Sequence, residues 1–251
     1  EMCIRDRFNS AIYSWVQGIC QSVAMPVAYI VLALIFTLEL YNASTRIDGA
    51  GGGATFGAEI VFKTMIKFVL CKLAVDMTPQ ILGAIFELSS NIIGNISGGA
   101  PGTSVAADLD ALRASISGLN GIFPKLFLCL QVTIIWIVFK FSSMLITVVV
   151  IGRMVEIYIY TAIAAVPIAT LGGGDLGMIG KNFLKSFAAV CVQGVLIYIA
   201  MSMFGTLAVS IPSGGLAGGD VTGVLFQCLL YSLVLVMAVF SSGRLAKSIC
   251  N

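Results

Sequence analysis

Two long apolar stretches limit what this chain can fold into. Residues 15–38 contain no charged residue and are bounded by the aromatic residues Trp15 and Tyr41. Residues 127–151 are interrupted by a single charge, Lys140. An α-helix needs about 20 consecutive apolar residues to cross the hydrocarbon core of a bilayer, so each stretch is long enough to do so. The pattern predicts an all-α fold, a polytopic transmembrane helical bundle.

The composition supports the same class of protein. Hydrophobic residues make up 59% of the chain and charged residues 10%, whereas soluble domains carry about 25% charged residues. A water-soluble surface cannot be built from so few charges. We expect one transmembrane domain over residues 8–251. Residues 1–7 resemble translated adapter sequence, and we expect this segment to be non-native.

Five crossings are predicted from the apolar stretches, at about residues 15–38, 60–78, 126–151, 183–209 and 221–242. Pro26 should kink the first helix without ending it, and Thr78–Pro79 should break or kink the second. Residues 80–96 form an amphipathic helix with Gln80, Glu87 and Asn91 on its polar face. Residues 154–171 fit three descriptions: a re-entrant segment, an interfacial segment or a sixth span.

The basic residues favour five crossings over six, because Lys and Arg accumulate on the cytoplasmic side of membrane proteins. With five crossings, the C-terminus is cytoplasmic and nine basic residues lie on that side. They are Arg46, Lys63, Lys67, Lys72, Arg153, Lys181, Lys185, Arg244 and Lys247. Six crossings would need a tight turn near Lys140–Ser143 and would move five of these nine outside.

Residues for enzymatic or metal chemistry are scarce. The chain has no histidine, and its seven cysteines are scattered without a C-x-x-C pair. Histidine-dependent hydrolysis and histidine-ligated zinc sites are therefore excluded. The glycine-rich segment at residues 49–53 is not followed by G-K-[ST], so it is not a phosphate-binding loop. We predict no enzymatic activity, no cofactor and no bound metal.

The candidate functional residues are charged groups within apolar helices: Lys140, Arg153, Glu156, Lys63 and Lys67. An ionisable group at the centre of a membrane helix costs at least about 2.5–3.5 kcal/mol unless it faces protein, water or an opposite charge. Arg153 and Glu156 are three residues apart and can neutralise each other on one helix. Two interpretations stay open for all five: anchoring at the membrane interface, or contact with a conduit or another subunit.

One segment resembles a known family. It runs from Arg153 to Thr170 with the pattern R-x-x-E-I-Y-x-Y-T-A-I-A-x-x-P-I-A-T, and is followed by residues 180–185 and by Gln193–Gly194. The segment resembles the TrbL-like polytopic inner-membrane subunit of conjugative type IV secretion systems, especially the version in mobile elements of Gram-positive bacteria.

The resemblance implies a channel or scaffold subunit in the bacterial cytoplasmic membrane, which assists the transfer of single-stranded DNA with its bound relaxase. It implies a homo-oligomer in contact with membrane lipids, with other conjugation-apparatus subunits including ATPases, and transiently with the translocated single-stranded DNA. Two alternatives to this role stay open: the membrane domain of a small-molecule transporter or permease, and a structural membrane protein that conducts nothing. A transporter would be expected to show repeated halves, and the sequence shows no internal repeat.

Overall fold

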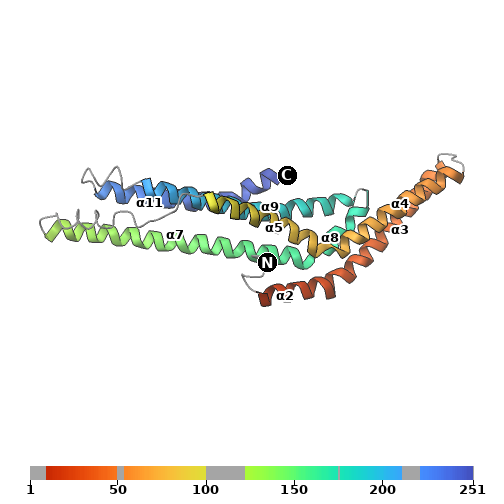
Figure 1. The fold of residues 1–251 in the computed structure, drawn as a ribbon, viewed down its shortest axis with the longest axis horizontal. Helices are drawn as coiled ribbons and strands as arrows, with labels where there is room; N and C mark the ends of the chain where they lie inside the picture. Colours follow the sequence, from red (N-terminus) through yellow and green to blue (C-terminus); the bar gives the residue numbers. More distant parts are fainter. Residues whose placement is uncertain (1–9, 50–53, 100–121, 175, 211–220, 251) are drawn as a thin grey trace. The chain divides into compact units, whose positions relative to one another are not determined.

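The computed structural model describes residues 10–49, 54–99, 122–174, 176–210 and 221–250, which are almost entirely helical and contain no strand (Figure 1). The all-α prediction is confirmed. The chain forms two compact units. Unit 1 comprises Glu1–Ser90, Met154–Cys191 and Ile249–Asn251, and unit 2 comprises Asn91–Arg153 and Val192–Ser248. Several helices run from one unit into the other, so the two units are described separately.

Unit 1 begins with one long helical stretch. It consists of α2 (Ser10–Ile19), a π-helical turn η1 (Cys20–Ala24) and α3 (Met25–Gly49). Met25 donates its backbone N–H to the Cys20 carbonyl, five residues earlier. Pro26 has no N–H and its ring would crowd the preceding turn of an α-helix, and the wider π turn accommodates it. The prediction that Pro26 does not end the helix is confirmed.

The next helix, α4 (Ala54–Asp76), packs against α3 in the opposite direction, and α5 (Thr78–Gly99) follows after a single residue. The Phe36 and Phe68 ring centroids are 4.3 Å apart across the α3–α4 contact. The predicted break at Thr78–Pro79 is present. The buried Thr78 hydroxyl donates to the Ala74 carbonyl at 3.1 Å, which satisfies one of the carbonyls that the end of α4 leaves open.

A 42-residue helix, α7 (Ile122–Ile163), contains most of the segment on which the family resemblance rests. It runs through Lys140–Ser143, so the tight turn required by the six-crossing interpretation is absent. It also runs through Gly152 and Arg153, which makes residues 154–163 the end of this helix rather than a separate element. The helix ends where Pro167 lacks the N–H that would bond to the Ile163 carbonyl.

A compact turn connects α7 to the next long helix. It contains α8 (Ala165–Ala169) and the 3-10 turn η2 (Thr170–Gly172), and α9 (Gly177–Ser210) then begins. The Ile168 N–H reaches the Ala164 carbonyl at 3.2 Å, and the Thr170 hydroxyl donates to the Pro167 carbonyl at 2.7 Å. These bonds hold the backbone around Pro167 without a regular helix.

The core of unit 1 is built largely from small side chains. Ala28, Ala164, Ala165 and Ala169 are fully buried, and such small side chains let the α3 and α8 backbones pack closely. Larger residues close the core from the sides: Leu82 from α5 and Phe187 from α9 are both fully buried. The segment that resembles the TrbL-like family therefore forms the packed centre of this unit.

Unit 2 contains most of α7, the second half of α9 and most of α11 (Val221–Cys250). The buried Gln193 side chain on α9 donates from Nε2 to the Ser242 Oγ on α11 at 3.1 Å. Ser242 donates in turn to the Val239 carbonyl at 2.6 Å. A Cβ placed on Gly243 would lie 3.1 Å from Gln193 Nε2, so the glycine leaves room for this side chain.

Four helices within the described ranges are long and apolar enough to cross a membrane: Ala11–Thr45, Lys125–Ile163, Gly177–Leu207 and Phe226–Cys250. This is one fewer than the five crossings predicted. The missing candidate is α4, because its charged residues Glu59, Lys63, Lys67, Lys72 and Asp76 interrupt every apolar window. In the most apolar window of α7, only 11% of the residues are buried. The chain is a multi-pass membrane protein.

Candidate functional site

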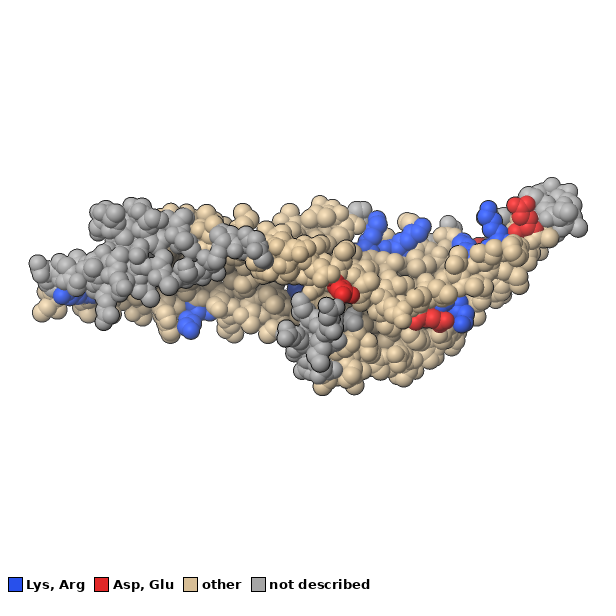
Figure 2. All heavy atoms as spheres, viewed as in Figure 1, with Lys and Arg blue, Asp and Glu red and all other residues tan. Residues whose placement is uncertain are grey.

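Most of the charged side chains visible in Figure 2 lie toward the right of the view, where Figure 1 places α3 and α4, and residues without charge cover most of the other described surface in view. This part of unit 1 contains two of the predicted residues, Lys63 and Lys67. They lie one turn apart on α4, and both are exposed. Their placement fits either membrane anchoring or contact with a partner, the two interpretations that the sequence leaves open.

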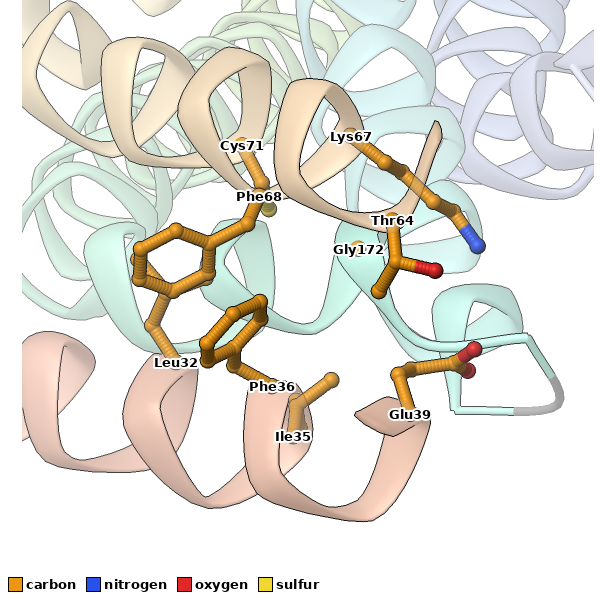
Figure 3. Close-up of a pocket in the computed structure, with 9 residues that line it drawn as sticks. All are labelled: Leu32, Ile35, Phe36, Glu39, Thr64, Lys67, Phe68, Cys71 and Gly172. Carbon is orange, nitrogen blue, oxygen red and sulfur yellow. The ribbon is translucent and has the colours of Figure 1, made fainter. Parts of the chain in front are cut away.

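A small cleft lies between α3, α4 and η2 (Figure 3). The polar ends of Glu39, Thr64 and Lys67 lie on one side of it, and the rings of Phe36 and Phe68 lie on the other. Its volume is about 10 Å³, which is about the space that one water molecule needs. The cleft is therefore too small for an organic substrate or a nucleotide.

Gly172 lines this cleft, and together with Gly173 and Gly174 it contacts the α3–α4 pair. A Cβ on Gly172 would lie 3.2 Å from the Cys71 Sγ, and one on Gly173 would lie 3.2 Å from the Ile35 Cγ2. The Gly174 N–H donates to the Glu39 Oε1 at 2.6 Å, across 135 residues of sequence. Larger residues at these positions would push α3 and α4 away from the turn.

Cys71 adds a second contact between α4 and the turn. Its thiol donates to the Ala169 carbonyl at 3.5 Å and to the Ile168 carbonyl at 3.8 Å. These carbonyls lie at the end of α8, where the Ile168 carbonyl also accepts the Thr170 backbone N–H. Cys71 is 5% exposed. This arrangement indicates a packing role for Cys71, and no group of three metal-binding side chains occurs among the described residues.

A polar cluster joins α3 and α4 at the other end of their contact. The Tyr29 hydroxyl donates to the Asp76 Oδ1 at 2.6 Å, and the Lys72 Nζ lies 3.2 Å from the Asp76 Oδ2. Lys72 and Asp76 are four residues apart on α4, a spacing that places both side chains on one face of the helix. The Tyr29 contact was missed because Tyr29 lies within an uncharged span and 47 residues from its partner. The sequence gives no signal for such a distant pair.

The other predicted residues all lie on α7. Lys140, in unit 2, is exposed, and its ammonium lies 5.6 Å from the Trp136 ring centroid. A cation over an aromatic face is partly stabilised when water is absent. Arg153 and Glu156 lie one turn apart on this helix, and both are half-buried. The structure brings neither of them to the α3–α4 cleft, because no α7 residue lines it.

Comparison with known proteins gives one family match. Residues 5–165 match the TrbL/VirB6 plasmid conjugal transfer-like family. The match extends well before the resembling segment, since it includes α2 to α5 and all of α7, and it ends within that segment at residue 165. No curated protein and no solved structure matches the chain. Because the family match spans more than half of the sequence, the chain belongs to this family, whose members are membrane components of conjugal transfer.

Proposed function

We propose that this member of the TrbL/VirB6 family is a membrane-embedded channel or scaffold subunit of a type IV secretion apparatus. In this role it assists the passage of single-stranded DNA, with its bound relaxase, across the bacterial cytoplasmic membrane. The observation that carries the proposal is the family match over residues 5–165. Four apolar helices are consistent with a subunit that lies within the bilayer.

The exposed apolar surface supports an assembly with other subunits. In unit 2, Leu130, Ile134, Trp136, Phe141 and Met144 are exposed on several sides of α7. A helix that is apolar all round must be covered by lipid or by other membrane helices. We propose that copies of this chain and other apparatus subunits cover part of this surface. The ATPases then supply the energy for transfer.

The charged residues of the apolar helices belong to this proposal as contact residues. Lys140, Arg153 and Glu156 on α7, and Lys63 and Lys67 on α4, contact either the conduit or a neighbouring subunit. Exposure of Lys63, Lys67 and Lys140 on the surface of the chain supports this role. The C-terminus, with Arg244 and Lys247 near the end of α11, lies on the cytoplasmic side.

The test is a conjugation assay in a donor strain that carries the mobile element. Deletion of the gene should abolish transfer, and expression of the chain in trans should restore it. Formaldehyde cross-linking during mating, followed by precipitation of the tagged chain, should recover the transferred strand. Unchanged transfer after deletion would overturn the proposal. Loss of transfer without any recovered DNA would limit the role to a scaffold.

Charge substitutions test the contact residues separately. Lys140→Gln and the pair Arg153→Gln with Glu156→Gln should lower transfer frequency at equal protein levels in the membrane. Lys125→Gln, near the exposed start of α7, is the matched control because it removes the same charge from the very end of the apolar part of the helix. If the first two variants transfer at the wild-type frequency, these residues have an anchoring role and do not contact the conduit or a neighbouring subunit.

A further inference from the structure

The cluster of Tyr29, Lys72 and Asp76 carries charge on the outer surface of unit 1. The Lys72 side chain is 57% exposed and the Asp76 side chain is 40% exposed. Tyr29 is 39% exposed and donates its hydroxyl to Asp76 at 2.6 Å. The packed core of unit 1 therefore does not cover this cluster, so water, lipid or another subunit must contact it.

The depth of the cluster follows from the first helical stretch. Trp15 and Tyr41 are each 67% exposed, and exposed Trp and Tyr side chains favour the two membrane–water interfaces. At about 1.5 Å per residue, the helix between them is roughly 39 Å long, which matches a bilayer of about 40–45 Å including its interfaces. Tyr29 lies about midway between the two aromatic residues. Its hydrogen bond therefore brings Asp76 close to the middle of the bilayer.

A lysine and an aspartate at this depth are costly against hydrocarbon, and such residues generally face protein or water. Further polar side chains follow along the chain. Gln80, one turn after Asp76, and Glu87 are both exposed on α5. We infer that Tyr29, Lys72 and Asp76 line a water-filled passage near the middle of the membrane, and that Gln80 extends this polar wall beyond the break at Thr78–Pro79.

The biological role of the passage rests on the proposed function, because translocated DNA needs a hydrated route through the membrane. Its hydration is a property of the chain in a bilayer and is measured without conjugation. Labelled residues in a chain that is dispensable for transfer would overturn the proposed function and leave the passage. If the residues are not labelled in a chain that is required for transfer, the passage is overturned and the proposed function stands.

The experiment measures the reaction of introduced cysteines with a charged, membrane-impermeant methanethiosulfonate. Thiols react as thiolates, which form in water and not in hydrocarbon. The three buried cysteines, Cys20, Cys71 and Cys191, stay in place, and the other four of the seven are replaced by alanine. Lys72→Cys and Gln80→Cys are the test variants. Gln80→Cys leaves the Lys72–Asp76 ion pair intact, so it remains informative if Lys72→Cys fails to accumulate.

Leu70→Cys is the matched control. Leu70 is 62% exposed and lies two residues before Lys72 on the same helix, so it has nearly the same depth. Successive residues turn by about 100° on an α-helix, which places Leu70 on the side of α4 away from Lys72. It should face lipid or a neighbouring subunit. The whole chain is studied in native membrane vesicles of both orientations.

Lys72→Cys and Gln80→Cys should react at least about tenfold faster than Leu70→Cys. The inference is overturned if both react as slowly as Leu70→Cys. It is also overturned if mild oxidation links Lys72→Cys of one copy to the same residue of another and thereby prevents labelling. In that case a second copy of the chain, and not water, covers the cluster.

Discussion

Gly180 lies where no larger residue fits. A Cβ at this position would lie 2.6 Å from the Pro167 carbonyl oxygen and 2.8 Å from the Leu171 side chain. The backbone carbonyl belongs to the short α8 helix and cannot move without displacing the packed Ala164 and Ile168. We predict that Gly180→Ala lowers the free energy of unfolding by about 1–3 kcal/mol, the usual cost of overpacking. The unfolding midpoint in detergent measures the effect.

Gly194 provides the control for this prediction on the same helix, α9. A Cβ there meets nothing within 4 Å, and alanine is a better helix former than glycine by about 1 kcal/mol. Gly194→Ala should therefore leave stability unchanged or raise it. Equal destabilisation by the two substitutions would show that loss of glycine flexibility, and not the contact with Pro167, is the cause.

Glu39 is a second single-residue test, because its carboxylate joins α3 to the glycine turn. Glu39→Ala removes the acceptor of the Gly174 N–H and should cost about 0.5–1.5 kcal/mol, the net contribution of a typical hydrogen bond. Glu39→Gln keeps an acceptor oxygen and should lose less. Protease cleavage near residue 175 should become faster in Glu39→Ala. Glu59→Ala, which removes an exposed carboxylate from α4, should leave the cleavage rate unchanged.

The sequence predicted the breaks between helices better than the extent of the helices. Pro26, Pro79 and Pro167 are visible in the sequence, and each acts locally on backbone hydrogen bonds. The continuity of α7 through Gly152 and Arg153 was missed, because an isolated glycine costs only about 1 kcal/mol within a helix and packing outweighs it. The resembling segment could be recognised as unusual from its sequence, but its place in the packed core of unit 1 depends on contacts with distant helices.

Distant contacts also limit how much of the candidate site could be predicted from the sequence. The i,i+4 pair of Lys72 and Asp76 could be predicted from helical geometry. The third member of the cluster, Tyr29, could not, because its position depends on how α4 packs against α3. The same applies to the hydrogen bond from Gly174 to Glu39. Three consecutive glycines at residues 172–174 are typical of a turn, but only the packed structure shows that this turn contacts α3 and α4.

The pairing of α9 and α11 in unit 2 gives a test of one helix contact. Gln193→Leu keeps most of the side-chain volume and removes the hydrogen bond to Ser242. Hydrogen bonds between membrane helices average about 0.6 kcal/mol and reach about 1.7 kcal/mol, so we expect a loss in this range. Thermal unfolding in lipid nanodiscs would measure it.

Gln227→Leu is the control for this helix contact. The exposed Gln227 donates its Nε2 to the Tyr231 hydroxyl at 3.0 Å, within its own helix α11. The same substitution at this position removes a glutamine without touching the α9–α11 contact. A loss in Gln227→Leu as large as in Gln193→Leu would contradict a specific role for the Gln193–Ser242 hydrogen bond.

At the scale of the whole molecule, the number of crossings depends on α4 and α5. If only the four apolar helices cross, residues 50–53 and residues 100–121 lie on the same side of the membrane. If α4 and α5 together form one further crossing, these two segments lie on opposite sides. The polar cluster at the middle of the bilayer and the distribution of basic residues both favour the second arrangement.

We therefore predict that an epitope tag inserted at residues 51–53 and a tag at the C-terminus are both cytoplasmic, whereas a tag within residues 105–115 is external. Protease treatment of intact spheroplasts should remove only the tag within residues 105–115. Lysed spheroplasts, in which all three tags must be cleaved, are the control. Cleavage of the C-terminal tag, with protection of the tags at residues 51–53 and 105–115, would show that α4 and α5 return to the cytoplasmic side, because only α7, α9 and α11 then cross after residue 53. Lys72 and Asp76 would then lie in a re-entrant pair of helices, and a continuous polar wall across the membrane would need residues from another subunit.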